Sequence, residues 1–220
     1  MSTLLNEEVI DQVKEAFQTL DKDVSILFFE GEDCEYCDDT LNLVTELAEL
    51  TDKIHLDQYH LHQDQDIAQQ YNVDKAPGLV IASKNGAGAV DHGIRYAGIP
   101  AGHEFTSLIQ SLLLVSTGNA DLSPDTLDFL ETLDEPVHLQ VFVTTSCPYC
   151  PQAVNLAHRL AFASPKVEAE MIESSEFMDL SRQYNVSGVP DTSINHGAGR
   201  VVGAVPEDNI VSEIKKVLQA

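Results

Sequence analysis

Apolar runs and amphipathic segments alternate along the chain in a series that occurs twice. Two continuous apolar stretches, at 24–29 and 137–144, are typical of strands that are buried on both faces of a sheet. Each is preceded by a segment whose apolar residues recur at helical spacing, at 7–20 and 124–133. The pattern therefore predicts two similar units, each opening with a helix and a central strand.

A long amphipathic helix is expected after each central strand, and further elements follow it in the same order in both halves. The later elements expected are strands at 53–61 and 166–172, a strand at 78–82 with a turn at 84–86, strands at 191–194 and 200–204 around a turn at 195–197, and closing helices at 101–114 and 207–218. Helices and strands in this order around one sheet indicate an α/β fold.

An internal repeat supports the division into two units. A constant offset of 113 residues relates three pairs of positions, namely Cys34 and Cys147, Cys37 and Cys150, and Pro77 and Pro190. The tripeptide Tyr-Asn-Val precedes the proline at the same distance in both halves. The polar segment 117–124 lies between two helical patterns, so the units are expected to span 1–118 and 119–220.

The four cysteines form two Cys-x-x-Cys pairs, Cys34/Cys37 and Cys147/Cys150. A disulfide framework is typical of small secreted chains, and inert buried thiols do not explain why the same spacing occurs twice. A zinc site formed by both pairs stays open as an alternative, although 109 residues separate them and zinc ribbons place their pairs about 15–20 residues apart. A Cys-x-x-Cys between an apolar strand and a helix favours a redox-active pair.

Acidic residues dominate the charge of the chain, with 36 Asp and Glu against 12 Lys and Arg and a formal net charge of −24. Such a surface repels nucleic-acid phosphates and anionic lipids, so neither nucleic acid nor a membrane is an expected partner. No apolar run approaches the roughly 20 residues that span a bilayer, and the first residues lack the features of a signal peptide. We therefore expect a cytoplasmic protein.

Neither a cofactor nor a resident metal ion is expected. Gly86, Gly88 and Gly102 do not form a phosphate loop, and no dinucleotide fingerprint occurs, so electrons must arrive through another protein. His60 and His62 share a face of an expected strand, but such a pair is more typical of solvent-facing residues than of a metal site.

The order strand, Cys-x-x-Cys, helix and a later proline resembles the thioredoxin fold in both halves. Three stretches extend the resemblance to the glutaredoxin-like protein disulfide oxidoreductases of archaea and thermophilic bacteria: 47–53, 96–105 and Cys147-Pro148-Tyr149-Cys150-Pro151. This resemblance implies an α/β fold of two tandem thioredoxin-like units, each a central mixed β-sheet flanked by helices. It also implies a protein-disulfide oxidoreductase with two active pairs.

The resemblance further assigns two prolines to substrate binding. It implies that Pro77 and Pro190 are cis-prolines that face the cysteines. A cis X-Pro bond leaves the backbone of the preceding residue, Ala76 or Val189, free to pair with an extended substrate segment. These four residues are therefore the expected substrate-binding positions.

The expected chemistry is thiol–disulfide exchange, in which a thiolate is the nucleophile. A cysteine at a helix N-terminus has its thiolate stabilised by the helix dipole and by free backbone N–H groups. Cys34 and Cys147 are therefore expected to attack, and Cys37 and Cys150 to resolve the mixed disulfide. Pro148 is expected in the first helical turn, where its missing N–H costs nothing.

The two sites are not expected to be equivalent. Carboxylates at 30, 32, 33, 35, 38 and 39 surround Cys34, whereas mostly neutral residues surround Cys147. Neighbouring carboxylates disfavour a thiolate, so Cys147 is expected to have the lower thiol pKa and the faster exchange. The first site would then be more reducing, and would serve as an internal electron donor or as a docking site for a reductase.

The group that transfers protons is not evident from the sequence. Thioredoxin has a buried Asp six residues before its first Cys, and Phe28 and Val141 occupy these positions here. Weak candidates are Glu46, Glu170 and Glu173, and His158 as a proton relay. Glutathione use is doubtful, because only Lys75 and Arg182 lie near the prolines to hold its carboxylates.

The sequence is compatible with three functions. The first is a general enzyme that reduces, forms or isomerises disulfides of protein substrates. The second is an electron relay from a thioredoxin-reductase-like flavoprotein to a peroxiredoxin, similar to the thioredoxin-like arm of alkyl hydroperoxide reductases. Such arms usually keep one active pair, so two intact pairs favour the first function. The third, of a different class, is a non-catalytic zinc-binding or scaffold protein.

Overall fold

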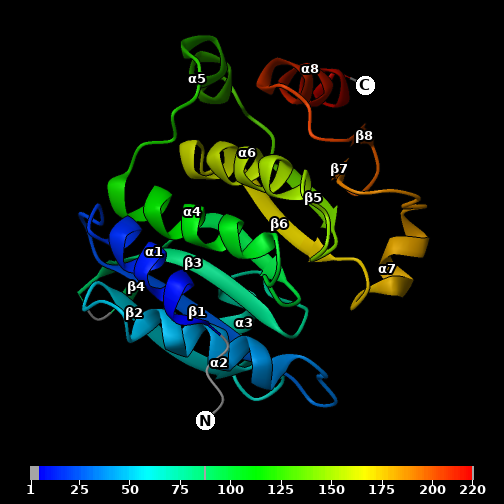
Figure 1. Cartoon of the computed structure of the whole chain (residues 1–220). Coiled ribbons are helices and arrows are strands. Elements are labelled where there is room, and N and C mark those ends of the chain that lie inside the picture. Colours follow the sequence, from blue (N-terminus) through cyan, green and yellow to red (C-terminus); the bar gives the residue numbers. More distant parts are fainter. Residues whose placement is uncertain (1–4, 87, 220) are drawn as a thin grey trace.

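The computed structural model describes residues 5–86 and 88–219, and both expected series of elements are present in it (Figure 1). The first series is α1 (Glu7–Phe17), β1 (Val24–Glu30), α2 (Cys37–Ala48), β2 (Ile54–His60), α3 (Gln65–Gln70), β3 (Gly78–Asn85), β4 (Gly88–Ala97) and α4 (Glu104–Thr117). The second series is α5 (Pro124–Glu131), β5 (Val137–Val143), α6 (Cys150–Ala163), β6 (Val167–Glu173), α7 (Met178–Gln183), β7 (Asp191–Ile194), β8 (Gly199–Val202) and α8 (Glu207–Leu218).

The central strands are buried as their apolar sequence predicts. In β1 every residue except Glu30 is buried, and in β5 every residue except the half-buried His138. Strands buried on both faces have no solvent-exposed polar face, which explains why apolar residues hold most positions of both strands, with Ser25 in β1 and His138 and Gln140 in β5 as exceptions. The helix and strand prediction is confirmed, with boundary differences of a few residues.

The two halves share one continuous mixed sheet with the strand order β2-β1-β3-β4-β6-β5-β7-β8. The sequence predicts a sheet in each unit but does not indicate that they join. The join is a parallel pairing of β4 with β6 from Ile94/Ala169 to Ala97/Ile172. Just before it, Gly93 has a positive φ of 72°, and a Cβ on it would overlap the carbonyl oxygen of Val167. Only glycine allows this close approach of the two halves.

Strand directions place both cysteine pairs at the same edge of the sheet. β1 and β4 are both antiparallel to β3, β4 is parallel to β6, and β6 is parallel to β5. β1 and β5 therefore run in the same direction, and each cysteine pair follows the carboxyl end of its strand. Four strand spacings separate β1 from β5, roughly 19 Å at about 4.8 Å each.

The helices cover the two faces of the sheet unequally. The largest apolar core contains residues of α1, α2, α4, α6 and α8 together with the inward side chains of the strands, including Val44, Leu108 and Leu156. On the opposite face, Ala68 of α3 packs against Phe29 and Leu180 of α7 packs against Phe142. Among the described residues, these two short helices are the ones that cover that face (Figure 1).

α4 and α6 lie side by side across the join of the two halves (Figure 1). A buried chain of hydrogen bonds links them, because the Ser111 hydroxyl lies 2.8 Å from the Tyr96 hydroxyl and 2.9 Å from Nδ1 of His158. α4 ends at Gly118, which adopts a left-handed conformation with φ 73°. None of the described helices has the length and apolar character needed to cross a bilayer.

Candidate functional site

The first cysteine pair lies directly after β1. Cys34 and Cys37 form a disulfide with a Cα–Cα distance of 5.5 Å. Cys34 is half-buried and Cys37 is buried. The sulfur of the first cysteine is therefore the more accessible of the two, as an attacking group requires.

The second pair has the same geometry after β5. Cys147 and Cys150 form a disulfide with a Cα–Cα distance of 5.5 Å. The backbone N–H of Cys150 donates to Sγ of Cys147 at 3.1 Å. This N–H belongs to the first turn of α6, where backbone donors have no partner within the helix. It is placed to stabilise negative charge on Cys147 when the pair is reduced.

The helices begin later than the sequence predicts. α2 starts at Cys37 and α6 at Cys150, so Cys34 and Cys147 lie in the turns that lead into the helices. The prediction that Pro148 occupies the first helical turn is wrong, because Pro148 lies in the turn and Pro151 is the second residue of α6. The physical argument survives, since the Cys147 sulfur still faces a free N–H of the helix terminus.

Both prolines named in the sequence are preceded by cis peptide bonds, Ala76–Pro77 and Val189–Pro190. In the second half, Sγ of Cys147 lies 3.8 Å from the carbonyl oxygen of Val189. In the first half, a Cβ on Gly31 would lie 2.8 Å from Cβ of Ala76, so the chain leading to Cys34 touches this residue. The prediction of two cis-prolines beside the cysteines is confirmed.

The residues before the prolines keep free backbone groups. The carbonyl oxygens of Pro77 and Pro190 accept N–H groups of Gly98 and Gly203 at 2.9 and 2.7 Å. Across the part of the chain that the structure describes, no such backbone bond involves Ala76 or Val189, and both are half-buried. An extended peptide could pair with them as with a strand edge.

The surroundings of the two pairs differ in charge as expected. The six acidic residues near Cys34 are all exposed: Glu30, Glu32, Asp33, Glu35, Asp38 and Asp39. Their field is visible at Tyr36, whose hydroxyl pKa is raised chiefly by the Glu35 carboxylate. At the second pair the corresponding positions hold neutral residues: Val143, Thr145, Ser146, Pro148, Pro151 and Gln152.

A buried carboxyl group at the start of α4, directly after the residue that contacts the turn of the second site, was not singled out from the sequence. Glu104, the first residue of α4, is fully buried, and the Ser107 hydroxyl donates to its Oε2 at 2.6 Å. Among the described atoms its Oε1 has no hydrogen-bond partner. Burial raises the pKa of Glu104 to about 7. The adjacent His103 N–H donates to the carbonyl of Thr145 at 2.9 Å, two residues before Cys147.

A second carboxyl group reaches the first site from the other half. Glu176, in the loop after β6, accepts the N–H of Ile99 at 2.7 Å. Burial, with smaller contributions from the Glu173 and Glu35 carboxylates, raises the pKa of Glu176 to about 7. A Cβ on Gly98 would lie 2.8 Å from Oε1 of Glu176, and the Gly98 N–H donates to the carbonyl of Pro77, which places this carboxyl group near the cis-proline of the first site. The first site thus has a half-buried carboxyl group of the other half nearby, and the buried Glu104 follows directly on the His103 contact to the turn of the second site.

The acids named from the sequence have other surroundings. Glu46 accepts the N–H of Leu5, and Glu170 pairs with Lys75 at 3.0 Å. Glu173 accepts the N–H groups of Ser175 and Glu176, which fixes the loop after β6. The signal for Glu104 in the sequence is one acidic residue at the start of the strongly apolar segment 104–115. Its burial is a result of tertiary packing, which periodicity does not reveal.

Other candidates from the sequence are engaged elsewhere. Lys75 is tied to Asp74 and Glu170, and Arg182 is exposed and paired with Asp179, so neither is free to hold glutathione. Burial lowers the pKa of His158 to about 3, and this histidine stays neutral in the helix interface rather than relaying protons. The four sulfurs form two disulfides four strands apart, which contradicts a zinc ion shared by both pairs.

Comparison with known proteins gives consistent results. A family model described as thioredoxin domain matches residues 137–218. The structure of a protein disulfide oxidoreductase from Aeropyrum pernix K1 superposes with a TM-score of 0.88 at 27% identity, covering 97% of this chain and 94% of that one. The NTD_N/C domain of the alkylhydroperoxide reductase AhpF from Enterococcus faecalis gives 0.87 at 28% identity, covering 96% and 99%.

A curated relative of Ferdinandcohnia aciditolerans, named NADH dehydrogenase, is 26% identical over 211 residues, which are 96% of this chain and 37% of the relative. The chain therefore spans little more than a third of the length of the curated relatives it matches. The two-pair architecture, the shared sheet and both solved structures lead to one conclusion: the chain has the fold of two joined thioredoxin-like units with two Cys-x-x-Cys pairs, and it is similar to protein disulfide oxidoreductases of this architecture.

Proposed function

We propose that this protein catalyses dithiol–disulfide exchange with protein substrates at two sites. The supporting observation is that each Cys-x-x-Cys disulfide lies beside a cis-proline whose preceding residue has an unused backbone edge. In this proposal Cys34 and Cys147 are the attacking cysteines, and Cys37 and Cys150 resolve. Ala76, Pro77, Val189 and Pro190 form the substrate platforms of two units, 1–118 and 119–220.

In the reducing direction, the Cys147 thiolate attacks one sulfur of a substrate disulfide. A Cys147–substrate bond forms, the substrate S–S bond breaks, and the other substrate sulfur leaves as a thiolate that takes up a proton. The Cys150 thiolate then attacks Sγ of Cys147. The Cys147–Cys150 disulfide forms, the second substrate sulfur leaves, and two electrons have passed to the substrate. The same steps in reverse form a disulfide in the substrate. Isomerisation results when the Cys147 thiolate attacks a substrate disulfide and a different substrate thiolate then displaces Cys147, which forms a new substrate disulfide.

Cys150 is fully buried, so its proton needs an acceptor inside the protein. Glu104 is the supporting candidate at this site, because a carboxyl group with a pKa of about 7 exchanges its proton readily at neutral pH. Glu176 is the corresponding candidate at the first site. In both cases the residue acts on a cysteine pair of the other half.

The relay function remains the second candidate, because one specific comparison favours it. The domain of AhpF that superposes on this chain belongs to a protein named alkylhydroperoxide reductase. Under this reading a thioredoxin-reductase-like flavoprotein reduces the chain, and the chain reduces a peroxiredoxin. A cytoplasmic location is proposed with it, because that compartment keeps thiols reduced.

Insulin reduction tests the main proposal. The wild type should precipitate insulin with dithiothreitol as reductant, Cys147→Ser should lose most of this activity, and Cys34→Ser should lose less. Equal rates in the wild type and in a variant lacking all four cysteines would contradict the proposal. A second assay, peroxide consumption with thioredoxin reductase and a 2-Cys peroxiredoxin, then distinguishes the relay function. A relay should support peroxide consumption at a higher rate than insulin reduction, whereas a general oxidoreductase should not.

A further inference from the structure

A cleft of about 830 Å³ opens on the sheet face that carries only α3 and α7. Its floor is formed by β4, β6 and β5, so residues of both halves line it. Side chains alternate between the faces of a strand. On this face β5 therefore presents His138 and Gln140 before the apolar Phe142, and β6 presents Glu168 and Glu170 before Ile172. We call this hollow the sheet cleft.

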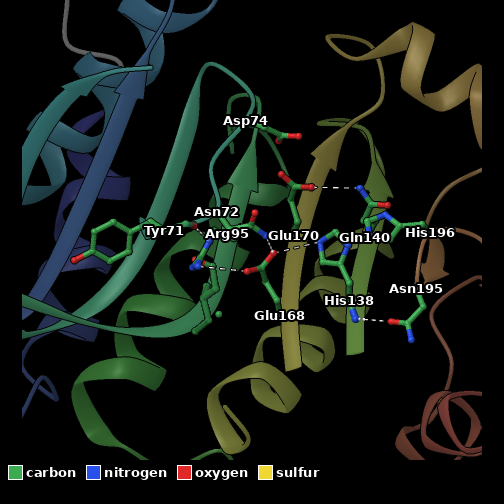
Figure 2. A network of polar contacts seen from close by, with 12 residues as sticks. Tyr71, Asn72, Asp74, Arg95, His138, Gln140, Glu168, Glu170, Asn195 and His196 are labelled. Atoms are coloured by element: carbon green, nitrogen blue, oxygen red, sulfur yellow. Dashed lines mark hydrogen bonds and ion pairs between the residues drawn. The ribbon is translucent and has the colours of Figure 1, made fainter. Parts of the chain in front are cut away.

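The floor of the sheet cleft is polar although it lies in the middle of the sheet. Figure 2 shows Glu168 between Arg95 and His138, and Glu170 beside Gln140. The strand register explains these neighbours, because Arg95 is paired with Glu170, Gln140 with Glu170, and His138 with Glu168. Arg95 is 3% exposed and Gln140 is 4% exposed. A polar floor this well buried stabilises the sheet less than apolar residues would, which suggests a binding role.

Carboxylates outnumber the cations that they face. Lys75 Nζ contacts both Asp74 at 2.6 Å and Glu170 at 3.0 Å. The Arg95 guanidinium contacts both Asp91 at 2.5 Å and Glu168 at 3.5 Å. One carboxylate charge in each cluster is therefore left without a cation of its own. Burial raises the pKa of Glu168 and of Glu170, as expected where compensation is incomplete.

Two acceptors on the same floor have no donor among the described residues. Gln140 donates its Nε2 to Glu170 at 3.5 Å, and its Oε1 is buried without a partner. His138 faces Glu168 through Nε2 at 3.4 Å, and its Nδ1 is also buried without a partner. Burial and the nearby His196 lower the pKa of His138 to about 4, so the ring is neutral and Nδ1 accepts. Buried acceptors without donors are rare in native proteins.

We propose that the sheet cleft binds a small organic cation that carries an ammonium or guanidinium group. Such a group supplies the N–H donors that Gln140 Oε1 and His138 Nδ1 lack, and its charge balances Glu168 and Glu170. A bare metal ion fits less well, because the cleft is far larger than an ion and the described residues hold no group of three His, Cys, Asp or Glu placed as ligands. The site needs none of the cysteines and is independent of the proposed redox function.

Agmatine is the probe, since it carries a guanidinium at one end and an ammonium at the other. Isothermal titration in 150 mM NaCl suppresses the general attraction of cations to the acidic surface, because the Debye length is then about 8 Å. We expect saturable 1:1 binding of agmatine and no binding of the uncharged butylurea. In the wild type, agmatine should shift the side-chain amide resonances of Gln140 and the ring resonances of His138.

Glu170→Gln and Gln140→Leu should each weaken agmatine binding by at least about tenfold, the effect of losing a hydrogen bond to a charged group. Asp11→Asn is the matched control, because it removes one exposed carboxylate of α1 outside the cleft and should leave the affinity unchanged. Unsaturable binding, equal affinity for butylurea, or unmoved Gln140 and His138 resonances would overturn the proposal. An acetylated Gly-Arg-Gly amide that binds more tightly than agmatine would identify the source of the cation as a protein side chain.

Discussion

The backbone N–H of His103 donates to the carbonyl oxygen of Thr145 at 2.9 Å, and thereby joins the start of α4 to the turn that carries Cys147. The two residues belong to different halves of the chain. Gly102, with φ 59°, lies so close to this turn that a Cβ would overlap the Thr145 carbonyl oxygen. The second cysteine pair is therefore held in place by both halves.

Gly102→Ala should loosen this contact. The added Cβ forces α4 away from Thr145. Holding an alanine in the left-handed backbone conformation costs a further free energy of about 1–2 kcal/mol. Gly86→Ala is the matched control, because Gly86 has the same φ of 59° and no described atom within 4 Å of its Cβ position. Urea unfolding should show Gly102→Ala less stable than Gly86→Ala by about 2 kcal/mol. In the reduced protein, Gly102→Ala should also change the alkylation rate of Cys147 but not that of Cys34. Equal stabilities would show that the contact does not matter.

The Cys147 thiol should have a lower pKa than the Cys34 thiol. The Cys150 N–H faces the Cys147 sulfur at 3.1 Å, whereas six exposed carboxylates surround Cys34. The pH dependence of iodoacetamide alkylation, followed in Cys150→Ser and in Cys37→Ser, measures the two values. Cys150→Ser should also accumulate more mixed disulfide with substrate. A Cys34 pKa at or below that of Cys147 would refute this order.

Glu104 should make the protein less stable as the pH rises. Its pKa is raised from 4.5 to about 7, so the folded state binds more protons than the unfolded state between these values. Stability is therefore lost between about pH 4.5 and pH 7, by up to about 3 kcal/mol for a shift of this size. Glu104→Gln should remove part of this decline in urea titrations. The exposed Glu15→Gln serves as control and should keep it. Unchanged slopes in Glu104→Gln would contradict the buried carboxyl group.

Glu104→Gln should also slow exchange at the second pair above pH 7 and leave the first pair unaffected. Glu176→Gln should slow exchange at the first pair and leave the second pair unaffected. The reason is that each acid is proposed to accept the proton of the cysteine pair in the other half. Stopped-flow oxidation of each pair, measured in variants that lack the other pair, separates the two effects. Parallel losses at both pairs in either variant would argue for a general structural effect.

His158 should limit stability on the acid side. Burial lowers its pKa to about 3, so the unfolded state binds the proton first as the pH falls below about 6.5. Stability that is present above pH 6.5 is therefore lost towards pH 3. His158→Gln should be less stable at pH 7, because its bond to Ser111 is lost, yet should lose less on acidification. His62→Gln, at an exposed position, should match the wild type throughout.

Local features of the sequence predict most of this fold. The buried strands β1 and β5 follow from continuous apolar runs, and the cis-prolines follow from the register that they share with the cysteines. The parallel join of β4 and β6 does not follow, because β4 carries the charged Arg95, whose ion-pair partner Glu168 lies 73 residues away in the sequence. Glu104 was missed because tertiary packing, which the sequence pattern does not show, buries its carboxyl group.

The parallel pairing of β4 with β6 has a consequence for how electrons travel. Backbone hydrogen bonds across this join leave no hinge between the halves, so the spacing of the two cysteine pairs along the sheet is constant. Disulfide exchange requires sulfurs in van der Waals contact, and the pairs are roughly 19 Å apart. Direct transfer from Cys34/Cys37 to Cys147/Cys150 is therefore excluded within one molecule, against the expectation of an internal donor. Each pair keeps its own redox state until a visiting protein carries reducing equivalents from one to the other.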